Sequence, residues 1–213
     1  MPLTRILHRA GNFQELLHLS RHPAVDAIEA DIWVMNGRLF AHHQRPVGRF
    51  LFDNRGPALG VDRVPLEVIL DAVQGHSDFV IDLRSWFGDP APDLARTLAL
   101  QLDGFSHIHV TCEAWHIADR LREWLPGLNV AYSIRKPKQL RGFIRDVDAG
   151  RIRPTPVTVR HTLLRSPGVV EALRERAGRV GAWTVDDVER GLELKRWNVD
   201  AVVSNQLTVL NAL

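Results

Sequence analysis

The strongest constraint on the fold is a repeat, because short apolar or β-branched runs alternate with longer segments of helical periodicity along the chain. Such runs predict buried strands, and their alternation with helices is typical of repeated βα units around a parallel sheet. Eight strands are expected, at residues 3–8, 27–33, 78–83, 107–112, 128–133, 155–160, 179–184 and 199–204. This count predicts a single closed (β/α)8 TIM barrel over residues 1–213, with an open doubly wound sheet as the alternative.

The expected helices are placed by the spacing of their apolar residues and by residues that favour helix starts. They are predicted at 13–21, 66–74, 94–102, 115–125 and 137–148, from Ser166-Pro167 onward, and at 187–197. Asn12 and Asp186 are expected to cap the first and the last of these helices. Pro65 and Pro137 are expected in first turns. Residues 44–64 show no clear pattern, so a short irregular loop or a small excursion is expected after the second strand.

Composition excludes several classes of partner and compartment. The 27 Lys and Arg residues leave a formal net charge of only +2 and are scattered, so neither nucleic acid nor an anionic membrane is indicated as a partner. A single cysteine, Cys112, cannot form an internal disulfide, so the fold needs no oxidising compartment. Neither a signal-like start nor a run of about 18 apolar residues is found, which favours a cytoplasmic protein without an integral membrane segment. The oligomeric state is left open.

Three acidic residues within predicted strands point to a metal site. Glu29 and Asp31 are two positions apart, so in an extended strand they share one face, about 6.5 to 7 Å apart along the chain. Close like charges raise one pKa sharply unless a cation keeps both groups ionised, although a solvated polar face is the simpler alternative. Asp82 follows Phe79-Val80-Ile81, in a buried strand where an unpaired carboxylate is costly. Together the three carboxylates can supply oxygen ligands to one Mg²⁺ or Ca²⁺ ion.

Other polar residues fall at the predicted strand ends, where a (β/α)8 barrel places its chemistry. They are expected to gather on one rim: His8, Asp82, Arg84, Glu113, His161 and Trp183. His8 and His42 are candidates for proton transfer, because an imidazole titrates near neutral pH. His43, next to His42, leaves the choice between those two histidines open.

Taken in order, these residues resemble a known family. His8-Arg9, Glu29-Ala30-Asp31 and His42 follow the HR…E-x-D…H order of the glycerophosphodiester phosphodiesterases, whose fold is a TIM barrel. Segments similar to the family's third strand, the stretch before it and its last two strands lie at 79–84, 65–70, 182–186 and 198–205. The chain is also similar to the related sphingomyelinase D and phospholipase D toxins, which are longer, secreted and disulfide-bonded.

The sequence departs from the family pattern in several places. Ala10 precedes the glycine that usually follows His-Arg, and Asp82 and Arg84 stand where Glu and Lys are common. His43 and Asn205 stand where acids are usual.

The resemblance implies roles for individual residues. Glu29, Asp31 and Asp82 would be the metal ligands, and His8 and His42 the acid/base pair. Substrate contacts are expected from residues on the same rim: Arg9, Arg84, Glu113, His161 and Trp183.

The implied activity is metal-dependent cleavage of a glycerophosphodiester, which releases an alcohol and glycerol phosphate. Two alternatives stay open at this point. The protein could be a lysophospholipase D or a cyclising phosphotransferase that acts on lysophospholipids, with rim aromatics admitting an acyl chain: Trp33, Phe50, Phe52, Trp86 and Phe87. Alternatively, it could be a non-catalytic barrel that binds a phosphate ligand. The expected partner is a small-molecule phosphodiester or a lysophospholipid.

Overall fold

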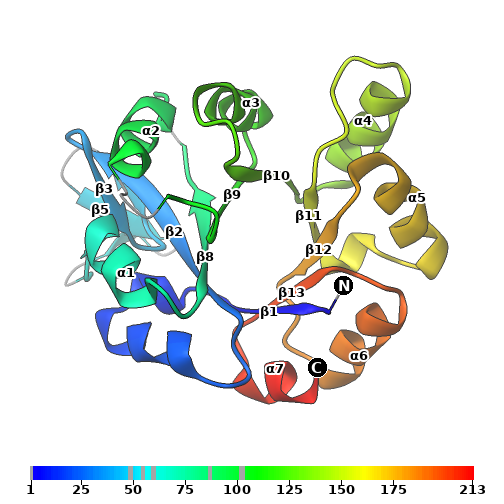
Figure 1. The fold of residues 1–213 in the computed structure, drawn as a ribbon, viewed down its shortest axis with the longest axis horizontal. Helices are drawn as coiled ribbons and strands as arrows, with labels where there is room; N and C mark the ends of the chain where they lie inside the picture. The colour runs from blue at the N-terminus through cyan, green and yellow to red at the C-terminus, as the bar shows by residue number, and fades with distance from the viewer. Residues whose placement is uncertain (1, 48–49, 54–55, 59–60, 86–87, 101–103) are drawn as a thin grey trace.

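The computed structural model describes residues 2–47, 50–53, 56–58, 61–85, 88–100 and 104–213. Eight parallel strands close into a barrel, which confirms the predicted TIM barrel over the open sheet (Figure 1). The barrel strands are β1 (Thr4–Leu7), β2 (Ala27–Met35), β8 (Asp78–Leu83), β9 (Ile108–Cys112), β10 (Asn129–Ile134), β11 (Val157–Arg160), β12 (Val180–Trp183) and β13 (Ala201–Ser204). The ring is closed because β1 pairs in parallel with both β13 and β2.

Helices surround the barrel on its outside (Figure 1). They are α1 (Leu66–Val73), α2 (Ala91–Ala99), α3 (Trp115–Trp124), α4 (Pro137–Asp148), α5 (Pro167–Ala177), α6 (Val188–Arg196) and α7 (Leu207–Ala212). Pro137 and Pro167 each occupy the first position of a helix, as expected from their fixed φ angle. Leu102, expected to extend the third helix, lies outside the described residues.

The connection from β1 to β2 differs from the predicted α-helix over 13–21. It consists of two 3₁₀ helices, η1 (Ala10–Asn12) and η2 (Gln14–Arg21). Asn12 does not cap a helix, because its side chain is bound to Asp31 instead: Nδ2 donates to Asp31 Oδ2 at 2.9 Å, and Oδ1 accepts from the Asp31 amide at 2.9 Å. A further 3₁₀ helix, η3 (His161–Leu163), follows β11.

The cap of α6 is also one residue away from its predicted position. Asp187 is the N-cap, and its side chain accepts a hydrogen bond from the Arg190 amide at 2.8 Å. The Asp186 carboxylate accepts from Asn205 instead, so it is not free to cap the helix.

Residues 44–64, expected to be irregular, contain short strands. β3 (Arg38–Ala41) forms a hairpin with β2 and pairs with β7 (Val64–Pro65). Between them, β4 (Arg45–Val47), β5 (Phe50–Asp53) and β6 (Gly56–Ala58) form a separate antiparallel sheet. Leu51 in β5 is buried between two more exposed phenylalanines, an alternation too short to read as a strand from sequence.

Burial explains why the barrel strands read as apolar runs. Along β2 the residues from Ala27 to Trp33 are all buried, because one face packs against helices and the other lines the barrel. Phe79 and Ile81 of β8 are fully buried, while Asp82 is less so. Asp31 lies opposite Asp82 in the parallel register between β2 and β8. The inward face of two neighbouring strands therefore carries the acidic residues.

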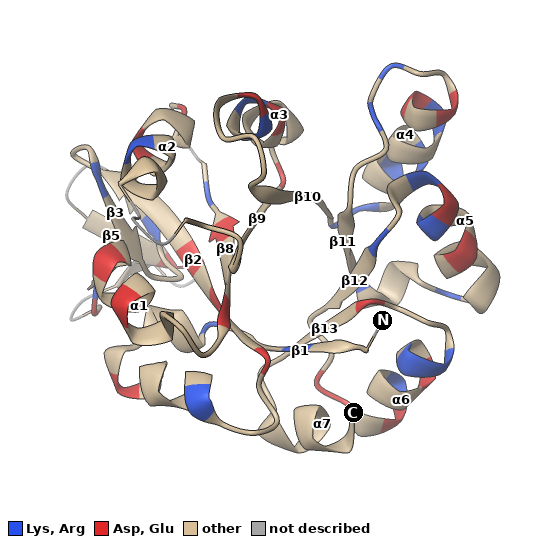
Figure 2. Cartoon of the chain, in the orientation of Figure 1, with Lys and Arg blue, Asp and Glu red and all other residues tan. Residues whose placement is uncertain are grey.

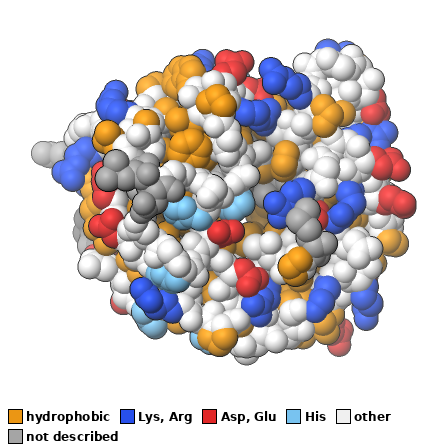
Figure 3. All heavy atoms as spheres, in the orientation of Figure 1, with side chains coloured by type: hydrophobic (Ala, Val, Ile, Leu, Met, Phe, Trp, Pro, Cys, Tyr) orange, Lys and Arg blue, Asp and Glu red, His pale blue; other side chains and the backbone are white. Residues whose placement is uncertain are grey.

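The charge distribution agrees with the modest net charge. Figure 2 shows acidic residues on β2 and β8, while the surrounding helices carry charges of both signs. The face in Figure 3 has basic and acidic side chains interspersed with hydrophobic ones. Among the described helices, none combines the length and the apolarity needed to cross a bilayer.

Candidate active site at the carboxyl end of the barrel

A cavity of about 110 Å³ lies at the carboxyl ends of the barrel strands, and all eight strands contribute to its wall. Seven of the ten predicted site residues line it: His8, Arg9, Glu29, Asp31, Asp82, Arg84 and Trp183. Arg135 also lines it, although sequence reasoning missed this residue. The signal available was its place directly after the strand Asn129–Ile134, where the other site residues of the barrel were sought.

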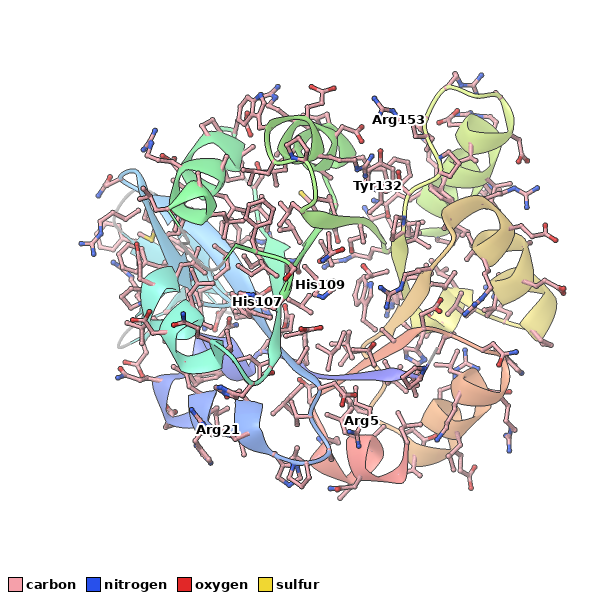
Figure 4. All side chains as sticks on the ribbon, in the orientation of Figure 1. Arg5, Arg21, His107, His109, Tyr132 and Arg153 are labelled. Atoms are coloured by element: carbon pink, nitrogen blue, oxygen red, sulfur yellow. The ribbon has the colours of Figure 1, made fainter. Side chains whose placement is uncertain are left out.

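A second cavity, of about 230 Å³, lies at the opposite mouth of the barrel. His109 and Asp78 stand there, with His109 Nε2 3.2 Å from Asp78 Oδ2. Figure 4 shows His109 on the inner side of the ring beside β9. The acidic cluster lies at the other end.

Glu29, Asp31 and Asp82 converge as predicted. Each offers an oxygen atom, and these oxygens all lie within 4.8 Å of one another. In the part of the chain that the structure describes, this is the one group of three or more His, Cys, Asp or Glu side chains close enough to share a metal ion. Glu29 is 4% exposed and Asp31 is 2% exposed, so a solvated polar face does not account for them.

The environment of the cluster raises the proton affinity of Glu29 and of Asp82. Burial, followed by the charges of Asp31 and Asp82, raises the pKa of Glu29 well above its ordinary value. Burial also raises the pKa of Asp82 to about 6, although the neighbouring Arg84 acts in the opposite direction. A bound divalent cation would relieve this repulsion, and carboxylate oxygens are the ligands that Mg²⁺ and Ca²⁺ prefer. The residues present therefore fit one hard cation.

Two arginines approach the cluster from its rim. Arg84 Nη1 donates to Asp82 Oδ2 at 2.8 Å, and its Nε lies 3.5 Å from Asp31 Oδ1. The Arg9 amide donates to Glu29 Oε2 at 2.7 Å, while Arg9 Nε lies 3.4 Å from Asp31 Oδ2. These contacts orient the carboxylates and place positive charge beside them.

Asn12 is a second residue that sequence reasoning missed at this site. Its 2% exposed side chain makes the two hydrogen bonds to Asp31 described above, one to the carboxylate and one to the amide. Such bonds fix the orientation of a ligating carboxylate. Only its position soon after His8-Arg9 could have pointed to it.

His8 lines the cavity with one ring nitrogen facing the acidic cluster. Its Nε2 lies 3.8 Å from Glu29 Oε2, while its Nδ1 lies 2.7 Å from Asn205 Oδ1. Burial lowers the pKa of His8, so its neutral form is favoured. The geometry suits a group that exchanges a proton at Nε2.

His42 is buried beside the cluster and does not line the cavity. Its amide donates to the Asp31 carbonyl at 3.1 Å, and its ring is stacked on Trp33 with centroids 6.0 Å apart. Burial lowers the pKa of His42 to about 4, and its Nε2 is buried without a hydrogen-bond partner. Burial also lowers the pKa of the half-buried His43, which feels the charge of Asp31. Both histidines therefore stand near the acidic cluster.

Glu113 and His161 do not line the cavity. Glu113 Oε1 lies 2.6 Å from Arg135 Nε, so it reaches the site through that arginine. His161 begins η3, where its carbonyl accepts from Arg190 at 2.8 Å. Their predicted contacts with a substrate stay predictions.

One hydrogen-bond donor in the cavity wall lacks an acceptor: Trp183 Nε1 is buried and makes no hydrogen bond. Arg9 Nε is also buried without a hydrogen bond, although it lies 3.4 Å from Asp31 Oδ2. The Arg135 guanidinium lies over the Trp183 ring, 5.5 Å from its centroid. Arginines and an indole N–H around an acidic cluster suit a ligand rich in acceptor oxygens, such as a phosphate.

Comparison with known proteins bears on the fold. No family model matches the sequence, and no curated protein matches it. Solved structures do match over nearly the whole chain, and they define its fold class as a TIM barrel.

The first of three such structures is a glycerophosphodiester phosphodiesterase from Agrobacterium tumefaciens, with a TM-score of 0.72, 19% identity, and 100% of each chain covered. The enzyme from Thermotoga maritima has a TM-score of 0.73 and 14% identity, covering 99% of this chain and 98% of the other. An Oleispira antarctica phosphodiesterase in complex with the product sn-glycerol-3-phosphate has a TM-score of 0.74 and 14% identity, covering 98% and 96%. The chain thus has the fold of the glycerophosphodiester phosphodiesterases.

Proposed function

We propose that the protein is a metal-dependent phosphodiesterase that hydrolyses glycerophosphodiesters to an alcohol and glycerol phosphate. The observation that carries this proposal is the triad of buried Glu29, buried Asp31 and partly exposed Asp82, beside the unpartnered Trp183 Nε1 donor, at the catalytic end of this fold. The Oleispira antarctica protein, which shares the fold, holds sn-glycerol-3-phosphate, the product class expected here.

The substrate phosphate is bound by the basic side of the cavity. Arg9, Arg84 and Arg135 line it and offer N–H groups to the non-bridging oxygens. Trp183 Nε1 is a further donor, and its ring forms part of the wall. Glu113 holds Arg135 in place through their 2.6 Å ion pair.

Glu29, Asp31 and Asp82 would hold one Mg²⁺ or Ca²⁺ ion, whose positive charge would stabilise the charge that builds on the phosphate oxygens. Asn12, Arg9 and Arg84 keep these carboxylates in position.

Proton transfer is assigned to the two predicted histidines. One imidazole accepts the proton of the attacking oxygen, and the other protonates the leaving alkoxide. His8 presents Nε2 to the cavity, and His42 has a buried Nε2 without a partner beside the same cluster. Burial lowers the pKa of both histidines, so each favours its neutral form, and the one that acts as the acid must first take up a proton at Nε2 from solvent.

The test is hydrolysis of a panel of glycerophosphodiesters and lysophospholipids by the purified protein, with Mg²⁺, with Ca²⁺ and with EDTA. We expect turnover of glycerophosphodiesters that EDTA abolishes and a cation restores. His8→Ala and His42→Ala should each lower kcat by about 10²–10⁴-fold. The matched control, His116→Ala on the exposed surface of α3, should keep full activity. Full activity in EDTA, or normal turnover in both histidine variants, would contradict the proposal.

The same panel separates the alternatives. Preferred release of choline or ethanolamine from lysophospholipids would indicate a lysophospholipase D, and a cyclic phosphate in ³¹P NMR would indicate a phosphotransferase. Of the predicted rim aromatics, the three that the structure describes do not line the cavity: Trp33 packs on His42, Phe50 is exposed, and Phe52 is half-buried. Trp86 and Phe87 lie outside the described residues. Tight phosphate binding without turnover would indicate a binding protein.

A further inference from the structure

A chain of hydrogen bonds runs from the cavity to a carboxylate that the proposed reaction does not use. His8 Nδ1 lies 2.7 Å from Asn205 Oδ1, and Asn205 Nδ2 donates to Asp186 Oδ2 at 2.7 Å. The other oxygen of Asp186 accepts from the Asn205 amide at 2.8 Å and from the Ser204 hydroxyl at 3.2 Å. Asp186 therefore holds both the backbone and the side chain of Asn205.

This arrangement fixes the orientation of the Asn205 amide group. An ionised carboxylate only accepts hydrogen bonds, so the side of Asn205 that faces Asp186 must be its NH₂ group. The carbonyl oxygen of Asn205 must then face His8. Because a carbonyl oxygen is also only an acceptor, the proton of neutral His8 must be on Nδ1.

We infer that Asp186 is a positioning residue that sets the tautomer of His8 through Asn205. With the proton on Nδ1, the lone pair of Nε2 is free and faces the cavity near Glu29. This is the form that can accept a proton from a reacting oxygen. The functional meaning of the inference rests on the proposed phosphodiesterase activity, whereas the tautomer itself can be measured without it.

The structure also explains how Asn205 can stand where the resembling family usually has an acid. An acid at that position would contact His8 directly and orient it. Here the carboxylate belongs to Asp186, one step further along the chain of hydrogen bonds. It fixes the orientation of the neutral Asn205 amide group, whose oxygen accepts the hydrogen bond of the His8 imidazole.

Asp186→Asn is expected to invert the tautomer. The backbone amide of Asn205 cannot turn, so the new side chain keeps its oxygen on that amide and turns its NH₂ group toward the Asn205 side chain. Asn205 then flips to present its oxygen to that NH₂ group and its own NH₂ group to His8 Nδ1. The proton of His8 moves to Nε2, which removes the free lone pair from the cavity.

The first measurement is the tautomer of His8 by two-bond ¹H–¹⁵N correlation NMR at neutral pH, on the 213-residue chain without substrate. The wild type should show protonated Nδ1, and Asp186→Asn should show protonated Nε2. The second measurement is kcat on a glycerophosphodiester, which should fall by about a hundredfold or more when the tautomer is wrong.

A double variant that exchanges Asp186 and Asn205 should restore the tautomer of His8 and the activity. In Asp186→Asn/Asn205→Asp the carboxylate accepts from His8 Nδ1 directly, and the new amide donates to it. We expect the Nδ1 tautomer to return, with kcat within about tenfold of the wild type. Asp187→Asn is the matched control, because it removes the same charge one residue away at the α6 cap, where Asn caps equally well.

Other results would overturn the inference. These are protonated Nε2 in the wild type, an unchanged tautomer in Asp186→Asn, or a double variant that stays folded and keeps protonated Nε2. A merely structural role for Asp186 would lower the melting temperature and leave the tautomer unchanged. If the wild type hydrolyses no phosphodiester, the proposed function fails while the NMR result still decides the inference.

Discussion

Asp82 illustrates the energetic cost of the acidic cluster at the scale of a single residue. Burial among other carboxylates raises its pKa to about 6, against an ordinary 3.8. A group with a raised pKa binds a proton more readily in the folded state, so its ionised form opposes folding. Stability without metal therefore falls as the pH rises through this interval.

We expect Asp82→Asn to stabilise the metal-free protein by about 1–3 kcal/mol above pH 6, because one pKa unit corresponds to about 1.4 kcal/mol. This advantage should disappear below about pH 4, where Asp82 of the wild type is protonated. Thermal unfolding in EDTA, measured from below pH 4 to above pH 6, gives the difference in stability between the variant and the wild type. Asp71→Asn, on the exposed face of α1, is the control and should show no such pH dependence. A variant less stable than the wild type at neutral pH would contradict the account.

Gly11 allows η1 to lie close to β2. A Cβ atom at Gly11 would lie 2.8 Å from Ala30 Cβ and 3.4 Å from the Glu29 carbonyl oxygen. Real Cβ atoms do not approach so closely, so Gly11→Ala must displace η1 or β2 beside a proposed metal ligand.

The expected cost of Gly11→Ala is about 1–3 kcal/mol in the free energy of unfolding, with a loss of activity. Gly142→Ala is the matched control, because nothing lies within 4 Å of its added Cβ in α4. The control should be neutral or stabilising by up to about 1 kcal/mol, since Ala favours a helix more than Gly does. Denaturant unfolding of both variants checks the pair, and equal stabilities would argue against the close contact.

At the scale of elements, the sheet of β4, β5 and β6 is an addition to the barrel. Its described strands pair only with one another, and Leu51 is its buried centre at 3% exposure. Local stability depends on such buried contacts, so this sheet should open independently of the barrel strands.

Leu51→Ala should therefore destabilise this sheet selectively. Removal of a buried leucine commonly costs about 2–5 kcal/mol of folding free energy, and we expect that cost to fall on the sheet of β4, β5 and β6. Hydrogen exchange with mass spectrometry should show faster exchange in peptides covering β4 to β6, with unchanged protection of β2 and β8. Leu70→Ala in α1, whose leucine packs in the main core, should instead lower protection throughout the barrel. Uniform loss of protection in Leu51→Ala would show that the sheet and the barrel unfold together.

At the scale of the whole molecule, the three carboxylates of the proposed metal site lie on two neighbouring strands of the closed ring, β2 and β8. A ligand that binds only the folded state stabilises it, by about 2.7 kcal/mol at a concentration of a hundred times Kd. The proposed ligands come from β2 and β8, so a cation held by all three would require the folded barrel.

We expect Mg²⁺ or Ca²⁺ to raise the melting temperature of the wild-type protein in a concentration-dependent manner. Glu29→Gln/Asp31→Asn should remove this effect, because two of the three carboxylates are lost. Glu15→Gln, at an exposed position of η2, should respond as the wild type does. Differential scanning calorimetry with and without EDTA measures the shift, and a shift retained in the double variant would place the cation elsewhere.

The sequence by itself determined the (β/α)8 barrel and the shared face of Glu29 and Asp31, because burial imposes a period of two on strands and about 3.6 on helices. These patterns depend on neighbours along the chain and can be read locally. The tertiary structure alone decided that Asn12 holds Asp31, that Arg135 joins the cavity, and that Asp186 holds Asn205 instead of capping a helix. Each of these arrangements brings together residues from different strands or loops. It therefore depends on how the ring closes and on which rotamer each side chain adopts. Ring closure and rotamer choice produce no periodic pattern in the sequence.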